Sequence, residues 1–174
     1  MKRLTQKNLN TPVSHQIKEP NWFDIKRYKA LYKYIKKGRV LDLGAYMKNA
    51  HQWFPRGVEY VPLDWVPEIL PFENEQFDYI VVGQLLEHLG YPTIVLSQAF
   101  RVLKKRGILS LSVPLEETEK GEVDKIHVWS FSKQDILNLL SLYGKVWMKI
   151  LHSQYFPRYR YHFPHIVAYC RKYG

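Results

Sequence analysis

The hydrophobic positions of the chain follow two different periods. Between Trp22 and Lys37 apolar residues recur every three or four positions, which predicts an amphipathic helix, and Gly38 is placed to end it. Elsewhere, short apolar runs are bounded by glycine, proline or polar residues, as strands are. The expected strands are Arg39–Leu43, Val58–Leu63, Phe77–Val82, Ile108–Val113, Val146–Leu151 and Ile166–Cys170.

Helical spacing returns between several of these strands. The further expected helices are Ala45–Phe54, Pro92–Lys104 and Lys133–Leu142, the last preceded by Ser132, which is spaced from Asp135 as in a capping box. Strand–helix alternation at these lengths predicts an α/β fold with a doubly wound, mainly parallel sheet. The last two strands have no helix between them, which predicts an antiparallel C-terminal hairpin. We expect an N-terminal arm over residues 1–20 and a single domain over residues 21–174.

Composition narrows the class of protein. The chain has 174 residues, a net charge of +10 and a single cysteine, Cys170, which cannot form an internal disulfide. No apolar stretch approaches the roughly 20 residues that span a bilayer, so we expect a soluble, cytoplasmic protein without a membrane span. The positive charge has two interpretations: a solvated helix face that carries the lysines between Lys26 and Lys37, or a surface that attracts polyanions such as nucleic acid. The oligomeric state is not predicted.

Acidic and small residues follow the first two expected strands. Asp42 and Gly44 lie at the end of the first, and Asp64 at the end of the second. Because ligands of doubly wound sheets bind at the carboxyl ends of the strands, these residues are expected to border a ligand. Gly44 allows close approach of the backbone, and the two oxygens of Asp64 can accept both hydroxyl protons of a ribose.

A longer block, from Leu70 to Pro114, is more specific. An acidic turn precedes a Phe77–Asp78 strand start, Leu86–His88 follows that strand, and Arg101–Lys104 precedes a strand led by Gly107. In order and spacing this block closely resembles the type-11 family of class I S-adenosylmethionine-dependent methyltransferases. The resemblance implies a Rossmann-like methyltransferase fold, S-adenosylmethionine as the cofactor and methyl transfer as the activity.

The resemblance extends from about Gly38 to Gly144 and implies a set of contacts to the cofactor. Asp42 and Gly44 would border the methionine end, Asp64 would hold the ribose and Trp65 would lie against the adenine. The residues expected to contact the cofactor are Asp42, Gly44, Ala45, Asp64, Trp65, Gln84, Leu85 and His88.

Two departures from the family pattern affect the expected site. The glycine-rich turn keeps only Gly44, with Tyr46 and Lys48 where small residues are expected. Only five residues separate Asp64 from Leu70, where the family has a helix and a strand. We therefore expect a sheet shortened by one strand–helix element and a pocket that is open on its adenine side.

The histidines provide the candidates for acid–base chemistry. His127 follows a charged loop and can serve as a general base, although it can equally be a packing residue at a helix entrance. Glu87 is expected to form a structural hydrogen bond. His152, His162 and His165 lack metal-ligand spacing on one element, so no metal is expected.

Three hypotheses for function remain. The first is a methyltransferase with a small or anionic acceptor. The second is an RNA or protein methyltransferase that uses the basic surface and the alternating basic and aromatic residues Arg158–His162, which also suit a hairpin rim. The third is a non-catalytic binding module that has kept the methyltransferase fold.

Overall fold

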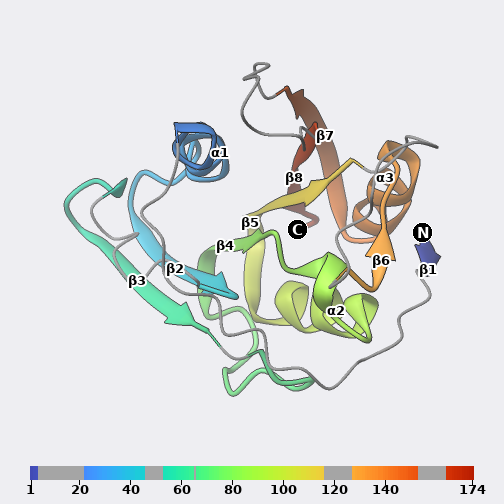
Figure 1. The fold of residues 1–174 in the computed structure, drawn as a ribbon. Coiled ribbons are helices and arrows are strands. Elements are labelled where there is room, and N and C mark those ends of the chain that lie inside the picture. Colours follow the sequence, from blue (N-terminus) through green and yellow to red (C-terminus); the bar gives the residue numbers. More distant parts are fainter. Residues whose placement is uncertain (4–21, 46–52, 65, 116–126, 153–163) are drawn as a thin grey trace.

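The computed structural model describes residues 1–3, 22–45, 53–64, 66–115, 127–152 and 164–174. Figure 1 shows the order of its elements along the chain. They are β1 (Lys2–Arg3), α1 (Trp22–Leu31), β2 (Gly38–Leu43), β3 (Val58–Leu63), β4 (Phe77–Gly83), the 3₁₀ helix η2 (Leu86–His88), α2 (Pro92–Val102), β5 (Leu103–Pro114), β6 (Trp129–Ser130), α3 (Lys133–Ser141), β7 (Gly144–Leu151) and β8 (His165–Lys172).

Six strands form the main sheet, in the order β3-β2-β4-β5-β8-β7. The first four are parallel, β8 runs antiparallel to β5, and β7 pairs antiparallel with β8. The predicted parallel sheet with an antiparallel C-terminal hairpin is therefore confirmed. A second, two-stranded pairing joins β1 to β6.

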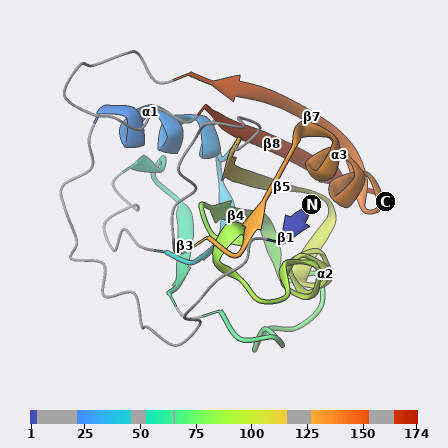
Figure 2. The ribbon, with the colours of Figure 1, turned by 45° about the vertical axis from the view of Figure 1, so that its right-hand side comes forward.

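The two faces of the sheet are covered by different helices (Figure 2). One face packs Val40 and Val81 against Leu31 and Ile35, from α1 and the turn after it. The other face packs side chains such as Leu41 against α2 and α3. Because successive strand residues point to opposite faces, Asp42 follows Val40 onto the face that α1 covers.

Two predicted helix ends are wrong. Helix α1 ends at Leu31 rather than near Lys37, and Gly38 begins β2 instead of capping the helix. Its φ of +96° and its approach to Asp78, 2.7 Å from an ideal Cβ position, explain why glycine is needed there. Helix α2 ends at Val102, because Leu103 already pairs with Phe77 in the parallel sheet.

The segment between β3 and β4 is shortened as expected. Described residues 66–76 contain no helix or strand, so β3 is an edge strand of the sheet. The guanidinium of Arg101 holds this segment by donating to the carbonyls of Leu70 and Phe72, at 2.9 and 2.8 Å. Leu70 is buried, and Phe72 packs edge-on against Phe77.

The predicted capping box at Ser132 is confirmed, since its hydroxyl accepts from the backbone N–H of Asp135 at 3.1 Å. Cys170 lies buried in β8, 3.4 Å from the carbonyl oxygen of Leu140, and burial raises the pKa of its thiol to about 12. Most of the predicted arm (4–20) and of the Ala45–Phe54 helix (46–52) lies outside the described residues. None of the described helices has the length and apolar character needed to cross a bilayer.

Candidate functional site

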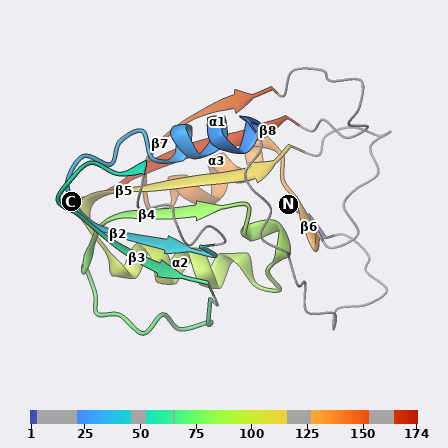
Figure 3. The ribbon, with the colours of Figure 1, turned by 60° about the vertical axis from the view of Figure 1, so that its left-hand side comes forward.

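The carboxyl ends of β2, β3 and β4 meet at one edge of the sheet, where Figure 3 shows the strand arrows ending together. Gly44 follows β2 with a φ of +69°, and its N–H donates to the carbonyl of Leu63 at 2.8 Å. A Cβ on Gly44 would lie 3.0 Å from Cδ1 of Leu85. The turn after β2 is thus held between the ends of its two neighbouring strands.

Gln84 continues this edge toward β5. It has a φ of +54°, a conformation that is uncommon outside glycine and concentrates at functional sites. Its N–H donates to the carbonyl of Ser112 at 2.9 Å, and its Nε2 donates to the Ser112 hydroxyl at 3.2 Å. These two bonds fix the backbone and the side chain of Gln84 beside the end of β5.

Asp64 lies directly after β3 and is exposed, so its carboxylate is available to a ligand. Ala45 is buried beside Gly44. Of the residues predicted to contact the cofactor, the structure therefore brings Gly44, Ala45, Gln84 and Leu85 to one edge, with Asp64 at the end of the adjacent strand. Trp65, Tyr46 and Lys48 lie outside the described residues.

Asp42 is placed differently, in the interior below this edge. Its side chain is 6 % exposed, and Oδ2 accepts from the hydroxyls of Tyr60 and Tyr32 at 2.9 and 3.3 Å. Burial raises the pKa of Asp42 to about 7, while the bonds from Tyr60 and Tyr32 oppose that rise. The carboxyl group thus has two protein donors on one oxygen and can carry a proton near neutral pH.

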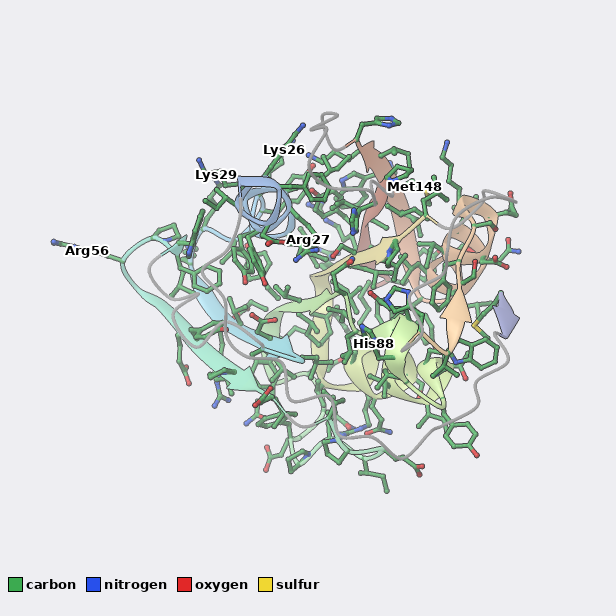
Figure 4. The ribbon with its side chains drawn as sticks, in the orientation of Figure 1. Lys26, Arg27, Lys29, Arg56, His88 and Met148 are labelled. Carbon is green, nitrogen blue, oxygen red and sulfur yellow. The ribbon has the colours of Figure 1, made fainter. Side chains whose placement is uncertain are left out.

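Arg27 is a candidate that the sequence analysis missed. Its side chain points inward from α1, whereas Lys26 and Lys29 project outward (Figure 4). One guanidinium nitrogen pairs with Asp24 at 3.0 Å, and the group lies 5.3 Å from the ring centroid of Tyr28. Its Nε is buried and has no hydrogen-bond partner among the described residues. Because buried N–H groups are normally paired, this donor is suited to an anionic group of a ligand.

A second group of polar side chains gathers after β4. Glu87 and His88 of η2 lie beside His127, with potential ligand atoms that are all within 4.8 Å of one another. The rings of His88 and His127 meet edge-on at 4.8 Å. Sequence reasoning treated these residues separately, because His127 follows a long loop. The only signal was a Glu-His pair after a strand and a later histidine before a helix.

The lysines between residues 26 and 37 are exposed, but only Lys26 and Lys29 lie on α1, and the others follow its end. Figure 4 shows Lys26, Lys29 and Arg56 at the rim of the molecule, away from the central position of His88. Their exposure agrees with either interpretation of the positive charge. Residues 158–162, expected to alternate basic and aromatic side chains at a nucleic-acid surface or hairpin rim, lie outside the described residues.

Comparison with known proteins identifies the family. A family model described as a methyltransferase domain matches residues 28–111, which contain β2 to β4, η2, α2 and most of β5. The matched segment belongs to the type-11 methyltransferase domain family. The predicted family and fold class are thereby confirmed, and the match supports S-adenosylmethionine as the cofactor. No curated protein matches the sequence at a significant level.

Solved structures agree on the methyltransferase fold. A SAM-dependent methyltransferase of Thermotoga maritima is 17 % identical, with a TM-score of 0.63 over 85 % of this chain and 88 % of that one. The 1,6-didemethyltoxoflavin-N1-methyltransferase of Burkholderia thailandensis, solved with S-adenosylhomocysteine, is 16 % identical, with a TM-score of 0.60 over 86 % and 77 %. The [4+2]-cyclase SpnF is 14 % identical, with a TM-score of 0.63 over 86 % and 80 %. At these identities the likeness establishes the fold, and SpnF illustrates that one fold hosts different reactions.

Proposed function

We propose that the chain binds S-adenosylmethionine at the edge formed by β2, β3 and β4 and transfers its methyl group to a small, anionic acceptor. The observation that carries this proposal is the convergence of Gly44, Gln84 and Leu85 beside the exposed Asp64. These residues offer a close backbone approach and a free carboxylate at the place where doubly wound sheets bind ligands.

Two charged residues suit opposite ends of the cofactor. The carboxylate of Asp64 can accept both ribose hydroxyl protons. The buried Nε of Arg27 can donate to the carboxylate of the methionine portion, in a chain whose turn lacks the usual further glycines. Charge-assisted bonds of this kind are about twice as strong as neutral ones. Asp64 and Arg27 therefore fit the ribose and the carboxylate of S-adenosylmethionine.

The bound cofactor supplies an electrophilic methyl group on a sulfonium. The work of the protein is to hold the acceptor nucleophile in line with that methyl and to exclude water from it. Positioning of this kind can remove about 7–11 kcal/mol of the barrier, so a catalytic triad is not required. A net charge of +10 favours the approach of an anionic acceptor.

Calorimetry with S-adenosylmethionine and S-adenosylhomocysteine tests the proposal. Each of Asp64→Asn and Arg27→Gln should weaken binding by about ten- to a hundredfold, because each removes a hydrogen bond to a charged group. Lys29→Gln is the matched control on α1, and its affinity should stay within about twofold of wild type, since exposed charges contribute little. No heat and no thermal stabilisation at millimolar ligand would favour a binding module that has lost the cofactor.

The acceptor class needs a separate measurement. Release of S-adenosylhomocysteine should be stimulated by small carboxylates or phosphates in a substrate panel, and not by RNA. An RNA methyltransferase would instead show RNA binding that weakens steeply with salt. Tight, salt-sensitive RNA binding together with RNA-stimulated turnover would replace the small acceptor in the proposal.

A further inference from the structure

The cofactor contacts proposed above do not require Glu87, His88 or His127, although the family resemblance implies a cofactor contact for His88. We propose that these three residues form a site for a divalent transition-metal ion, with zinc as the ion best matched to the ligands. The site uses one carboxylate and two imidazoles, the ligand set of zinc sites that keep coordination positions open. Metal binding does not depend on the proposed methyl transfer.

The backbone holds the three residues in place. The N–H of Val128 donates to the carbonyl of Glu87 at 2.7 Å, and the indole Nε1 of Trp129 donates to the carbonyl of Leu89 at 2.8 Å. These bonds hold the segment that begins at His127 against the middle residue of η2 and the residue that follows its C-terminal end. His127 therefore reaches His88 through a fixed backbone pairing, although a long stretch of chain separates them.

The distances suit a shared ion. Nε2 of His88 lies 4.0 Å from Oε1 of Glu87, and the rings of His88 and His127 are 4.8 Å apart between centroids. Two ligand atoms bound at about 2.1 Å to a tetrahedral ion lie roughly 3.4 Å apart. The Glu87–His88 pair therefore needs to approach by about 0.6 Å, and ligand atoms at the largest separation in the cluster, 4.8 Å, by about 1.4 Å. Rotation of side-chain dihedrals can provide this without moving the backbone.

Burial and ligand chemistry determine which ion fits. Glu87 is 1 % exposed, whereas His88 is about one-third exposed at its side chain (30 %). The carboxylate therefore lies inside, and the two half-buried imidazoles lie closer to solvent. Imidazole ligands favour zinc, cobalt or iron over magnesium, which prefers oxygen ligands in octahedral geometry. Three protein ligands leave at least one position for water or for an oxygen or nitrogen atom of a substrate.

The location adds a functional consequence, which rests on the proposed methyl transfer. Glu87 and His88 follow Gln84 and Leu85 in the chain, directly after the end of β4. A metal ion there would bind an acceptor atom near the cofactor edge. In that arrangement His127 and His88 are metal ligands, in place of the general base or packing residue and the cofactor contact that the sequence analysis expects of them.

The test uses the full chain, purified without a histidine tag and treated with a chelator, and titrates it with zinc alone and with cobalt alone. We expect one ion per chain and a cobalt absorption spectrum typical of imidazole ligands. His127→Gln and His88→Gln should weaken zinc binding by about a hundredfold or more, at least as much as removal of groups that orient metal ligands. Magnesium at millimolar concentration should not compete.

His152→Gln is the matched control, because His152 is an exposed histidine at the end of β7 and belongs to no cluster of the described residues. Its zinc affinity should equal that of wild type.

Glu87 is buried, so the substitution Glu87→Gln can unfold the chain. Its circular dichroism and melting curve are therefore measured first. If Glu87→Gln does not fold, the two histidine variants test the proposal. Absence of zinc binding to wild type would overturn the proposal, and so would equal affinities of all three histidine variants. Calorimetry with S-adenosylhomocysteine in the presence of chelator separates this failure from failure of the proposed function.

Discussion

Two buried carboxylates lie near the carboxyl edge of the same sheet, and their surroundings differ. Asp42, in β2, accepts hydrogen bonds from two tyrosine hydroxyls, which stay neutral because burial raises the pKa of each phenol. Glu87, after β4, lies beside two imidazoles, which can also bind a metal. A carboxylate taken out of water needs a proton, donors or a cation close by. The comparison indicates that Asp42 is adapted to holding a proton, and Glu87 to holding a cation.

The largest effect is expected for Asp42→Asn. Burial raises the pKa of Asp42 from 3.8 to about 7, so the folded chain retains a proton that the unfolded chain releases in this range. Stability from this group is fully present below pH 4 and is lost as the pH rises through 7. The amide does not titrate and still accepts from the tyrosines. Urea unfolding at pH 4 to pH 8 measures the free energy of unfolding of both proteins. Relative to wild type, that of Asp42→Asn should rise with pH, by about 1.4 kcal/mol per pH unit and by at most about 4 kcal/mol in total. A stability difference between Asp42→Asn and wild type that does not change with pH would contradict the raised pKa of Asp42.

The second effect separates the two carboxylates. Zinc at about 100 times its dissociation constant should stabilise the wild-type chain by about 2.7 kcal/mol, measured as a rise in melting temperature. Asp42→Asn should show the same rise, whereas Glu87→Gln should show none. Equal responses of the two variants would mean that the carboxylates do not differ in the way proposed.

A third, smaller effect is expected for Tyr60→Phe, which removes the shorter bond to Asp42. At pH 8 the lost bond is to a charged group and should cost about 1.5–3 kcal/mol, whereas at pH 5 it is to a neutral acid and should cost about 1 kcal/mol. Urea unfolding at both pH values measures the difference. A larger cost at pH 5 than at pH 8 would show that Asp42 is not the partner that matters.

The smallest effect is expected for Tyr32→Phe. Its hydroxyl lies 3.3 Å from Oδ2 of Asp42, longer than an ordinary hydroxyl bond, and its ring keeps its contact with Phe54 at a centroid distance of 4.7 Å. We expect a loss of about 0.5–1 kcal/mol in the same urea titration. A cost equal to that of Tyr60→Phe would mean that the two donors share the carboxyl equally.

Local patterns predicted most of the fold. The strands, the C-terminal hairpin and the capping box at Ser132 depend on residues close together in sequence, so their signals are visible there. The helix end at Val102 could not be predicted, because it depends on pairing with a distant strand. Helix α1 ends at Leu31 because turns with bonds three residues back follow it, and the apolar spacing continues through those turns. Leu103 joins β5 because Phe77 is its partner, and nothing in the apolar spacing of the helix indicates this.

The candidate site was predictable to a similar extent. Gly44 and Gln84 were found because they follow strands in a family pattern, and their roles as cofactor contacts stay predictions. Arg27 was missed, since only the structure shows that it points inward while Lys29 points outward. The cluster of Glu87, His88 and His127 was missed because it requires the backbone pairing between Val128 and η2.

The reactivity of Cys170 can report local opening of the folded chain. It is the single cysteine of the chain, it is buried, and the pKa of its thiol is raised to about 12. Alkylating reagents act on the thiolate, so the native protein should resist them at neutral pH, while any opening that frees β8 from α3 exposes the thiol. The rate of alkylation therefore reports how often β8 becomes accessible to solvent, without any added label.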